Sequence, residues 1–130
     1  MAFQYSPGLR TNQASQLQAT IGASGTLKIF SGAEPANTAA ADPTGLLATI
    51  TLPAAFLTSS GGVTTLAGSW TVAASAAGTA ASFRMYDGSA VCHIQGNVGT
   101  SGTDMIINNA VLASGQTVTV TAFGVTVPNS

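Results

Sequence analysis

Residues 82–96 read SFRMYDGSAVCHIQG and decide the local structure more plainly than any other stretch of this chain. Apolar and polar side chains alternate on both sides of Asp87-Gly88, a dipeptide that is typical of two-residue hairpin turns. We therefore expect a β-hairpin here. The period of two places Cys92 and Ile94 on the face toward the core and His93 on the opposite face.

The same stretch holds the only cysteine and the only histidine of the chain, so it is the first place to look for chemistry. On opposite faces of one strand, Cys92 and His93 cannot act together as nucleophile and base. One cysteine cannot form a disulfide within the chain, and a lone cysteine most often behaves as a small apolar residue. The residues favour a structural hairpin over an active site.

Charge is scarce in this chain of 130 residues, a length that suits one domain with its own core. It has 3 Lys and Arg and 4 Asp and Glu, so 5% of its residues are charged, against about 25% in an ordinary soluble domain. With a formal net charge of −1, free copies repel one another little. This suits a protein that lives docked against other proteins, although a neutral exported protein would have the same composition.

Two classes of partner are not expected. Arg10, Lys28 and Arg84 are scattered, whereas nucleic-acid binding needs clustered Lys and Arg to displace counterions from phosphates. The chain has no run of about 18 apolar residues, and its N-terminal MAFQYSPGLR lacks the basic-then-apolar order of a signal peptide. We therefore expect no direct nucleic-acid contact, no membrane span and no Sec signal.

A helical period occurs only near the start of the chain. Pro7 suits a first helical turn and Gly22 suits a C-cap. The side chains that recur four apart are Leu9, Gln13, Leu17 and Ile21. This spacing predicts one helix over about residues 8–21.

Beyond the helix the period becomes two, which is typical of half-buried strands. The expected inward positions are Leu27 and Ile29, then Leu46, Ala48, Ile50 and Leu52, then Trp70, Val72 and Ala74. The stretch SGAEPANTAAADPTG, residues 31–45, is rich in Gly, Pro, Asn and Asp and reads as a loop. We predict a mainly β chain, an antiparallel β-sandwich or jelly-roll-like domain with one short N-terminal helix. Its expected organisation is an arm and helix over 1–22 and a single β-sandwich domain over 23–130.

The last strand contains a change of hydrophobic phase. Val118, Val120 and Ala122 share one face, whereas Phe123, Val125 and Val127 share the other. A bulge at Phe123-Gly124, or a strand that passes from one sheet to the other, explains the change.

We find no pattern of catalytic, cofactor-binding or metal-ligating residues. A zinc site needs three or four ligands, and the chain offers one Cys and one His. The acids Glu34, Asp42, Asp87 and Asp104 all lie in or beside expected turns, where Asp is favoured for backbone reasons. No Ser lies in a G-x-S-x-G elbow between a strand and a helix. The threonine row at 117, 119 and 121 is explained by the strand propensity of Thr. We therefore expect that the protein is not an enzyme.

The order of segments TLKIFSGAEPANTAAADPTGLLATITLP, SFRMYDGSAVCHIQGNVGTSG and DMIINNAVLASGQTVTV resembles a family of small β-rich virion proteins of tailed bacteriophages. The resemblance covers nearly the whole chain, including MAFQYSPGLRTNQASQLQATIG, and depends on the order of the segments rather than on catalytic motifs. It implies a structural protein of the particle, made in the host cytoplasm and located in the virion.

Within such a particle, small size and a nearly uncharged surface suit a capsid decoration or cement protein that binds the major capsid protein on the capsid exterior. The alternatives are a collar, tail or fibre-attachment protein of the same virion and, from another class, a carbohydrate-binding module in host recognition. For that module, Trp70 and Tyr86 would be the stacking residues, although the alternation around Trp70 favours a core position.

The expected interface is the N-terminal arm and helix. Phe3 and Tyr5 have no evident strand partner, and short aromatic arms often anchor in a pocket of a partner. Leu9 and Leu17 belong to the apolar stripe of a helix that is too short to be stable alone in water. We expect these four residues to contact other virion proteins or further copies in a homo-oligomer.

Overall fold

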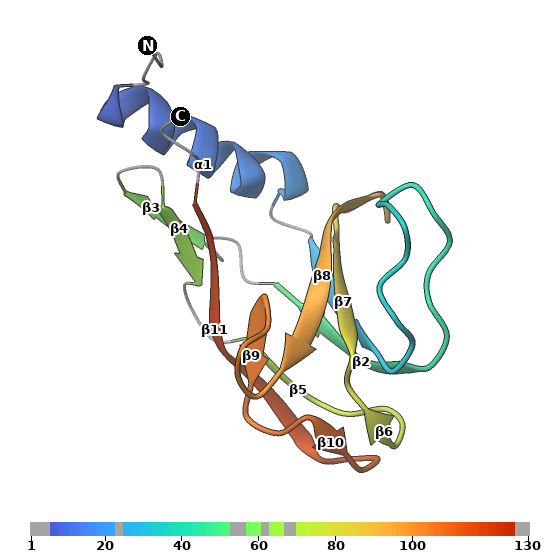
Figure 1. The fold of residues 1–130 in the computed structure, drawn as a ribbon. Helices are drawn as coiled ribbons and strands as arrows, with labels where there is room; N and C mark the ends of the chain where they lie inside the picture. Colours follow the sequence, from blue (N-terminus) through green and yellow to red (C-terminus); the bar gives the residue numbers. More distant parts are fainter. Residues whose placement is uncertain (1–5, 23–24, 53–56, 61–62, 67–69, 127–130) are drawn as a thin grey trace.

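The protein is mainly β, with one N-terminal helix packed against a strongly curled sheet (Figure 1). The computed structural model describes residues 6–22, 25–52, 57–60, 63–66 and 70–126. The predicted fold class is confirmed.

Helix α1, Pro7–Ile21, begins and ends where local chemistry requires. The Ser6 hydroxyl accepts the backbone N–H of Leu9 (3.2 Å), and Pro7 occupies the first helical position. At the other end Gly22 has a φ of 78°, the left-handed conformation of a helix C-cap. The helix packs against β3 and β4, and its last residue, Ile21, is buried in the core.

The strands form one large sheet and one small one. In the large sheet the order is β2-β1-β7-β8-β9-β11-β4-β3, with β5 also paired to β11, and β10 pairs with β6 separately. Their bounds are β1 Thr26–Phe30, β2 Leu46–Thr51, β3 Leu57–Ser60, β4 Val63–Leu66, β5 Thr71–Ala73, β6 Gly78–Thr79, β7 Ser82–Tyr86, β8 Cys92–Gly99, β9 Met105–Ile107, β10 Val111–Leu112 and β11 Thr117–Thr126. The pairings are antiparallel, except that β8 and β9 run parallel over two residue pairs.

The curled sheet almost closes on itself. Strand β5 pairs with β11, and directly after β5 the backbone N–H of Ser75 donates to the carbonyl of Leu47 in β2 (2.7 Å). The Ser75 hydroxyl donates to the same carbonyl (3.2 Å). The first strand of the sheet order is therefore joined to the β5–β11 side, and the inner side chains of both halves meet in one core.

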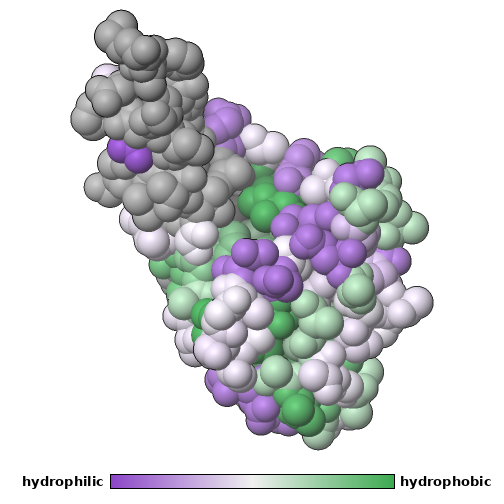
Figure 2. Space-filling model, viewed as in Figure 1, coloured by the Kyte–Doolittle hydropathy of each residue, from purple (hydrophilic) through white to green (hydrophobic). Residues whose placement is uncertain are grey.

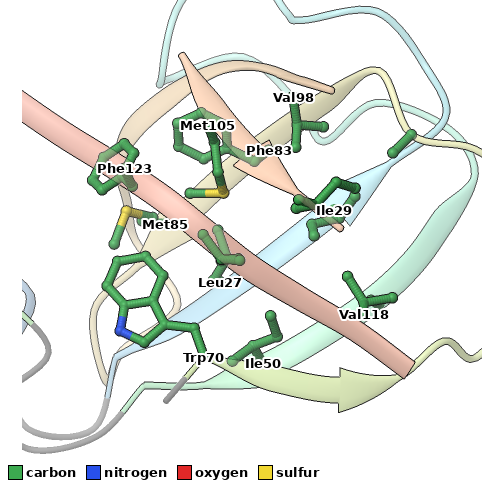
Figure 3. Packing of buried hydrophobic residues seen from close by; sticks show 14 of the residues in the cluster. Leu27, Ile29, Ile50, Trp70, Phe83, Met85, Val98, Met105, Val118 and Phe123 are labelled. Atoms are coloured by element: carbon green, nitrogen blue, oxygen red, sulfur yellow. The ribbon is translucent and has the colours of Figure 1, made fainter. Parts of the chain in front are cut away.

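Three aromatic rings lie together on one side of that core (Figure 3). The ring of Phe123 in β11 lies 5.6 Å from that of Phe83 in β7, edge to face, and 5.8 Å from that of Trp70. Trp70 is completely buried, so its predicted core position is confirmed. Such aromatic pairs add about 0.5–1.5 kcal/mol each beyond the burial of their area.

The structure departs from the predicted strand faces in β2 and in β11, and a β-bulge explains each departure. Ile29 pairs with Ala48 but Phe30 pairs with Leu46, so Leu47 is an extra residue in β2. Leu47 is buried and Leu46 is 40% exposed, which makes the predicted inward position of Leu46 wrong.

In β11 the predicted bulge exists, but it lies at Thr121, between Val120 and Ala122, rather than at Phe123-Gly124. Val120 and Phe123 are both buried as a result, and Ala122 is exposed. A bulge adds one residue to one strand and thereby reverses the faces of all residues beyond it.

Candidate functional site

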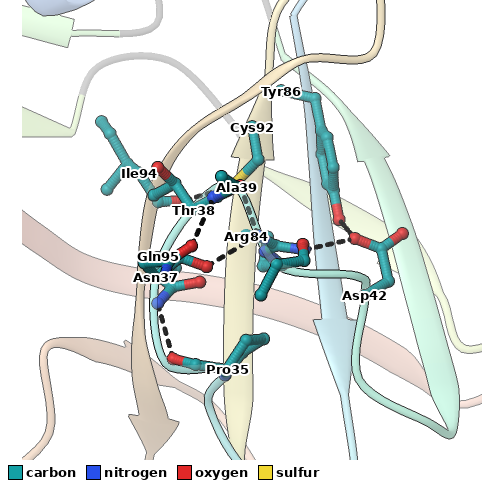
Figure 4. Close-up of polar contacts among 11 residues, drawn as sticks. Pro35, Asn37, Thr38, Ala39, Asp42, Arg84, Tyr86, Cys92, Ile94 and Gln95 are labelled. Carbon is teal, nitrogen blue, oxygen red and sulfur yellow. Dashed lines mark hydrogen bonds and ion pairs between the residues drawn. The ribbon is translucent and has the colours of Figure 1, made fainter.

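The outer face of β1, β7 and β8 carries the main polar cluster of the described structure. The register aligns Lys28, Arg84 and Gln95 across the three strands, and Tyr86 lies two residues from Arg84 on the same face. Loop 31–45 lies over this face (Figure 4). All five residues of β7 are buried, because the core covers one face of the strand and the loop covers the other.

Arg84 of β7 binds loop 31–45 through hydrogen bonds from its guanidinium. Its side chain is 1% exposed, and the four N–H groups of its two terminal nitrogens all point to acceptors in residues 37–42. Nη1 donates to the carbonyl of Ala40 (3.0 Å) and to Oδ1 of Asp42 (2.7 Å). Nη2 donates to the carbonyls of Thr38 (2.7 Å) and Asn37 (3.4 Å). One planar guanidinium therefore satisfies three backbone carbonyls and one carboxylate of a loop that is distant in sequence.

Asp42 and Tyr86 complete the cluster. The Tyr86 hydroxyl donates to Asp42 Oδ1, and Lys28 Nζ lies 5.0 Å from the centre of the Tyr86 ring. Burial raises the pKa of Asp42, but the hydrogen bonds from Tyr86 and Arg84 and the charges of Arg84 and Lys28 outweigh it and lower the pKa below its usual value. Burial and the hydrogen bond to Asp42 raise the pKa of Tyr86. The phenol is thus held neutral as a donor and the carboxylate is held charged as an acceptor.

Two further side chains of the sheet donate to the backbone of the loop. Gln95 Nε2 donates to the carbonyl of Pro35 (2.8 Å), and the Ser82 hydroxyl donates to the carbonyl of Gly32 (2.7 Å). The direction is the same in every case, since the sheet supplies donors and the loop supplies oxygen acceptors.

The hairpin between β7 and β8 exists as predicted, but its turn and its faces differ. Asp87-Gly88 is not a two-residue turn: the carbonyl of Asp87 accepts the N–H of Ala90 (3.0 Å), and Ala90 takes a φ of 64°. The loop therefore has three residues, a turn followed by a left-handed position. The Asp87 carboxylate closes it by accepting the N–H groups of Ser89 (2.8 Å) and Val91 (3.1 Å).

The predicted core position of Cys92 is wrong. Met85 pairs with Ile94 and Tyr86 pairs with Cys92, so His93 is an extra residue in β8. The bulge separates Cys92 from the core face of Ile94 and places it on the outer face with Tyr86.

Cys92 and His93 do not form a nucleophile–base pair. Burial raises the pKa of the Cys92 thiol, and nearby Arg84 offsets only part of that effect. A neutral thiol is a poor nucleophile. His93 Nε2 lies 2.8 Å from Asp87 Oδ2, and this contact is the first cause of the lowered pKa of Asp87. Both residues act within the hairpin.

Within the described residues, no three or more His, Cys, Asp or Glu side chains gather as metal ligands would. In the same part of the chain no helix has the length and apolar character needed to cross a membrane. The Trp70 and Tyr86 rings, the candidates for stacking on a sugar, are 0% and 4% exposed. Neither ring therefore offers a face to a ligand in this structure.

The expected interface residues are placed only in part. Leu9 lies on α1 and is 46% exposed, which is consistent with a contact outside the chain. Leu17 falls within α1, but its side chain is outside the described structure, as are Phe3 and Tyr5.

Sequence reasoning missed the Arg84–Asp42 cluster. It treated Arg84 as one of three scattered cations and Asp42 as a turn residue, whereas the fold brings Arg84, Lys28 and Asp42 around Tyr86. One signal was present in the sequence: Arg84 lies between Phe83 and Met85 in a strand of large side chains. Unless such a strand is at the edge of a sheet, its arginine has little chance of reaching water.

Comparison of the chain with protein-family models, with curated proteins and with solved structures found no match.

Proposed function

We propose that the protein is a non-enzymatic structural component of a tailed-bacteriophage virion, and specifically a capsid decoration protein that binds the major capsid protein. The virion assignment is supported by the resemblance in segment order along nearly the whole chain.

The structural role is supported chiefly by the positions of the charged side chains. Lys28 and Arg84, two of the three cationic residues, lie with Asp42 of loop 31–45 around Tyr86, and Asp87 pairs with His93 in the hairpin. Figure 2 shows a face on which pale side chains of weak polarity separate small hydrophilic and hydrophobic areas. A surface of small neutral side chains gives little repulsion between molecules and favours lasting contact with other proteins.

A collar, tail or fibre-attachment protein of the same particle is the second candidate, since it would share these properties. The carbohydrate-binding alternative has less support, because both proposed stacking rings are buried.

Virions that carry the chain provide the direct test. Mass spectrometry of purified particles would give its copy number relative to the major capsid protein, and cryo-electron microscopy would locate it. Many copies over the head would support the decoration protein. A few copies at one vertex or on the tail would support the second candidate, and absence from the particle would refute both.

We further propose that the N-terminal arm and α1 make the contact. Leu9 is a large apolar side chain exposed on α1, and Val111, 65% exposed on β10, lies at the opposite end of the molecule (Figure 1). Leu9→Ser should lower affinity for particles that lack the protein by about tenfold, if Leu9 is an interface anchor. Val111→Ser is the matched control and should bind as the wild type does. Equal occupancy by both variants at limiting concentration would place the contact elsewhere.

Removal of residues 1–5 tests the arm while leaving Ser6 to cap the helix. We expect a loss of about 2 kcal/mol or more in particle affinity, because aromatic anchors dominate binding energy. Unchanged urea unfolding would show that the β domain is intact. The same variant in sedimentation analysis tests whether the arm also supports a homo-oligomer.

A further inference from the structure

Loop 31–45 is closed at its base and has no regular structure of its own. The N–H of Ser31 donates to the carbonyl of Gly45 (2.8 Å), and the N–H of Gly32 donates to that of Thr44 (3.0 Å). Gly45 takes a φ of 77°, which side chains other than glycine rarely adopt. Loops of this length without secondary structure are uncommon in compact domains, and those that occur are usually either functional or disordered.

The loop has few apolar side chains with which to order itself. Between the two Gly residues of its base it contains Ala, Thr, Asn, Pro, Glu and Asp, and all of them are exposed or half-buried. What turns inward is its backbone, whose carbonyls accept from Ser82, Arg84 and Gln95. Residues 37–42 accept four hydrogen bonds from one group, the Arg84 guanidinium. The Tyr86 hydroxyl also donates to Asp42, and the N–H groups of Ala39 and Ala40 donate to Asn37 within the loop.

We propose that residues 37–42, together with Tyr86, form a guanidinium-binding site for which Arg84 is the built-in ligand, and that loop 31–45 closes over the sheet only when this site is filled. The site suits the terminal nitrogens of a guanidinium, although the buried Nε of Arg84 has no acceptor among the described residues. It offers four acceptors to one planar fork, a carboxylate for the charge, and the Tyr86 ring 6.0 Å from Arg84 Cζ.

The geometry also predicts selectivity. An ammonium carries three donors around one point and cannot span acceptors that are spread along six residues of backbone. Lys28 lies on the same face, where its ammonium is 5.0 Å from the centre of the Tyr86 ring and its charge helps to lower the pKa of Asp42. This inference does not depend on the proposed virion function.

Arg84→Ala empties the site. The atoms that this substitution removes from the side chain correspond to ethylguanidinium, which therefore matches the gap. We expect limited proteolysis and amide exchange within residues 33–44 to accelerate by about 100-fold, since four hydrogen bonds to a buried charge are lost. Ethylguanidinium at millimolar concentration should restore protection, whereas propylammonium at the same concentration should not. Lys28→Ala is the control, because it removes a cation from the same face and leaves the site filled.

The result that overturns the proposal is a loop in Arg84→Ala that stays protected, or one that opens and is not restored by ethylguanidinium. If Arg84→Ala fails to fold, Asp42→Asn and Tyr86→Phe decide the question, because each weakens the site while Arg84 remains. Faster exchange in residues 33–44 with unchanged exchange in β1 and β7 supports the proposal. Unchanged exchange in the loop of both variants refutes it.

Discussion

Gly96 occupies a point in β8 where the structure leaves no room for a side chain. It pairs with Phe83 across the hairpin, and a Cβ built on it would lie 2.8 Å from Cε1 of Phe83 and 2.6 Å from Oδ2 of Asp104. Carbon atoms in favourable contact are about 3.5–4.0 Å apart. The Phe83 ring is held in place by its edge-to-face contact with Phe123. Asp104 Oδ2 accepts the N–H of Asn97 (3.1 Å) and would lose this bond if displaced.

Gly96→Ala should therefore destabilise the protein. Overpacking of a core costs about 1–3 kcal/mol, and the lower chain entropy of unfolded alanine returns about 0.4–1 kcal/mol. The expected net loss in the free energy of unfolding is about 1–2 kcal/mol, which lowers Tm by roughly 3–8 °C in a domain of this size.

Urea unfolding followed by the fluorescence of the buried Trp70 would measure the loss. Gly8→Ala is the matched control, because Gly8 lies in α1 with nothing within 4 Å of its Cβ position and should be stabilised if it changes at all. Phe83→Leu in the Gly96→Ala background should cost about 1 kcal/mol less than it does alone, since it removes the clashing ring. A Gly96→Ala protein within 0.5 kcal/mol of wild type, or strict additivity with Phe83→Leu, would refute the steric account.

Three further predictions concern the hairpin and the loop. Ala90→Gly should stabilise the protein by about 0.5–1 kcal/mol in urea unfolding, because Ala90 holds a φ of 64° that glycine adopts without strain; a loss of stability would contradict this. The lowered pKa of Asp42 means that its contribution to stability is fully present above the ordinary value of 3.8 and is lost as pH falls through the lower folded value. Protection of the amides in residues 33–44, relative to their intrinsic exchange rates at each pH, should therefore fall below pH 3.8 in wild type, and the same pH series on Asp42→Asn should show a weaker dependence. Cys92→Ser should change stability by less than about 1 kcal/mol, because the thiol lies on the outer face beside polar groups; a loss above 2 kcal/mol would indicate a core position after all.

Local chemistry alone determined much of this fold. The limits of α1 follow from Ser6, Pro7 and Gly22, which satisfy or release the ends of a helix whatever surrounds it. Alternation placed Leu27, Ile29 and Trp70 in the core, and the hairpin at 82–96 was evident from its turn residues. Such features depend on neighbours within a few residues, so they can be predicted directly from the sequence.

Only the tertiary structure decided the faces beyond each bulge. A bulge at Leu47, His93 or Thr121 is set by how the strand must bend to meet its partner, and the partner can be far away in sequence. Because side chains alternate with a period of two, one extra residue reverses every position that follows. This is why the core assignments of Cys92 and Leu46 were wrong while those on the near side of each bulge were right.

The Arg84 cluster was decided by tertiary structure for a related reason. Asp42 and Arg84 are 42 residues apart, and their meeting requires β1 to pair with β7 and loop 31–45 to fold back over the outer face. A guanidinium is stable under that loop only because four acceptors arrive together. The residues next to Asp42 and Arg84 in the sequence do not indicate this contact. The hydrogen bonds and the ion pair that stabilise both side chains form only once the chain has folded.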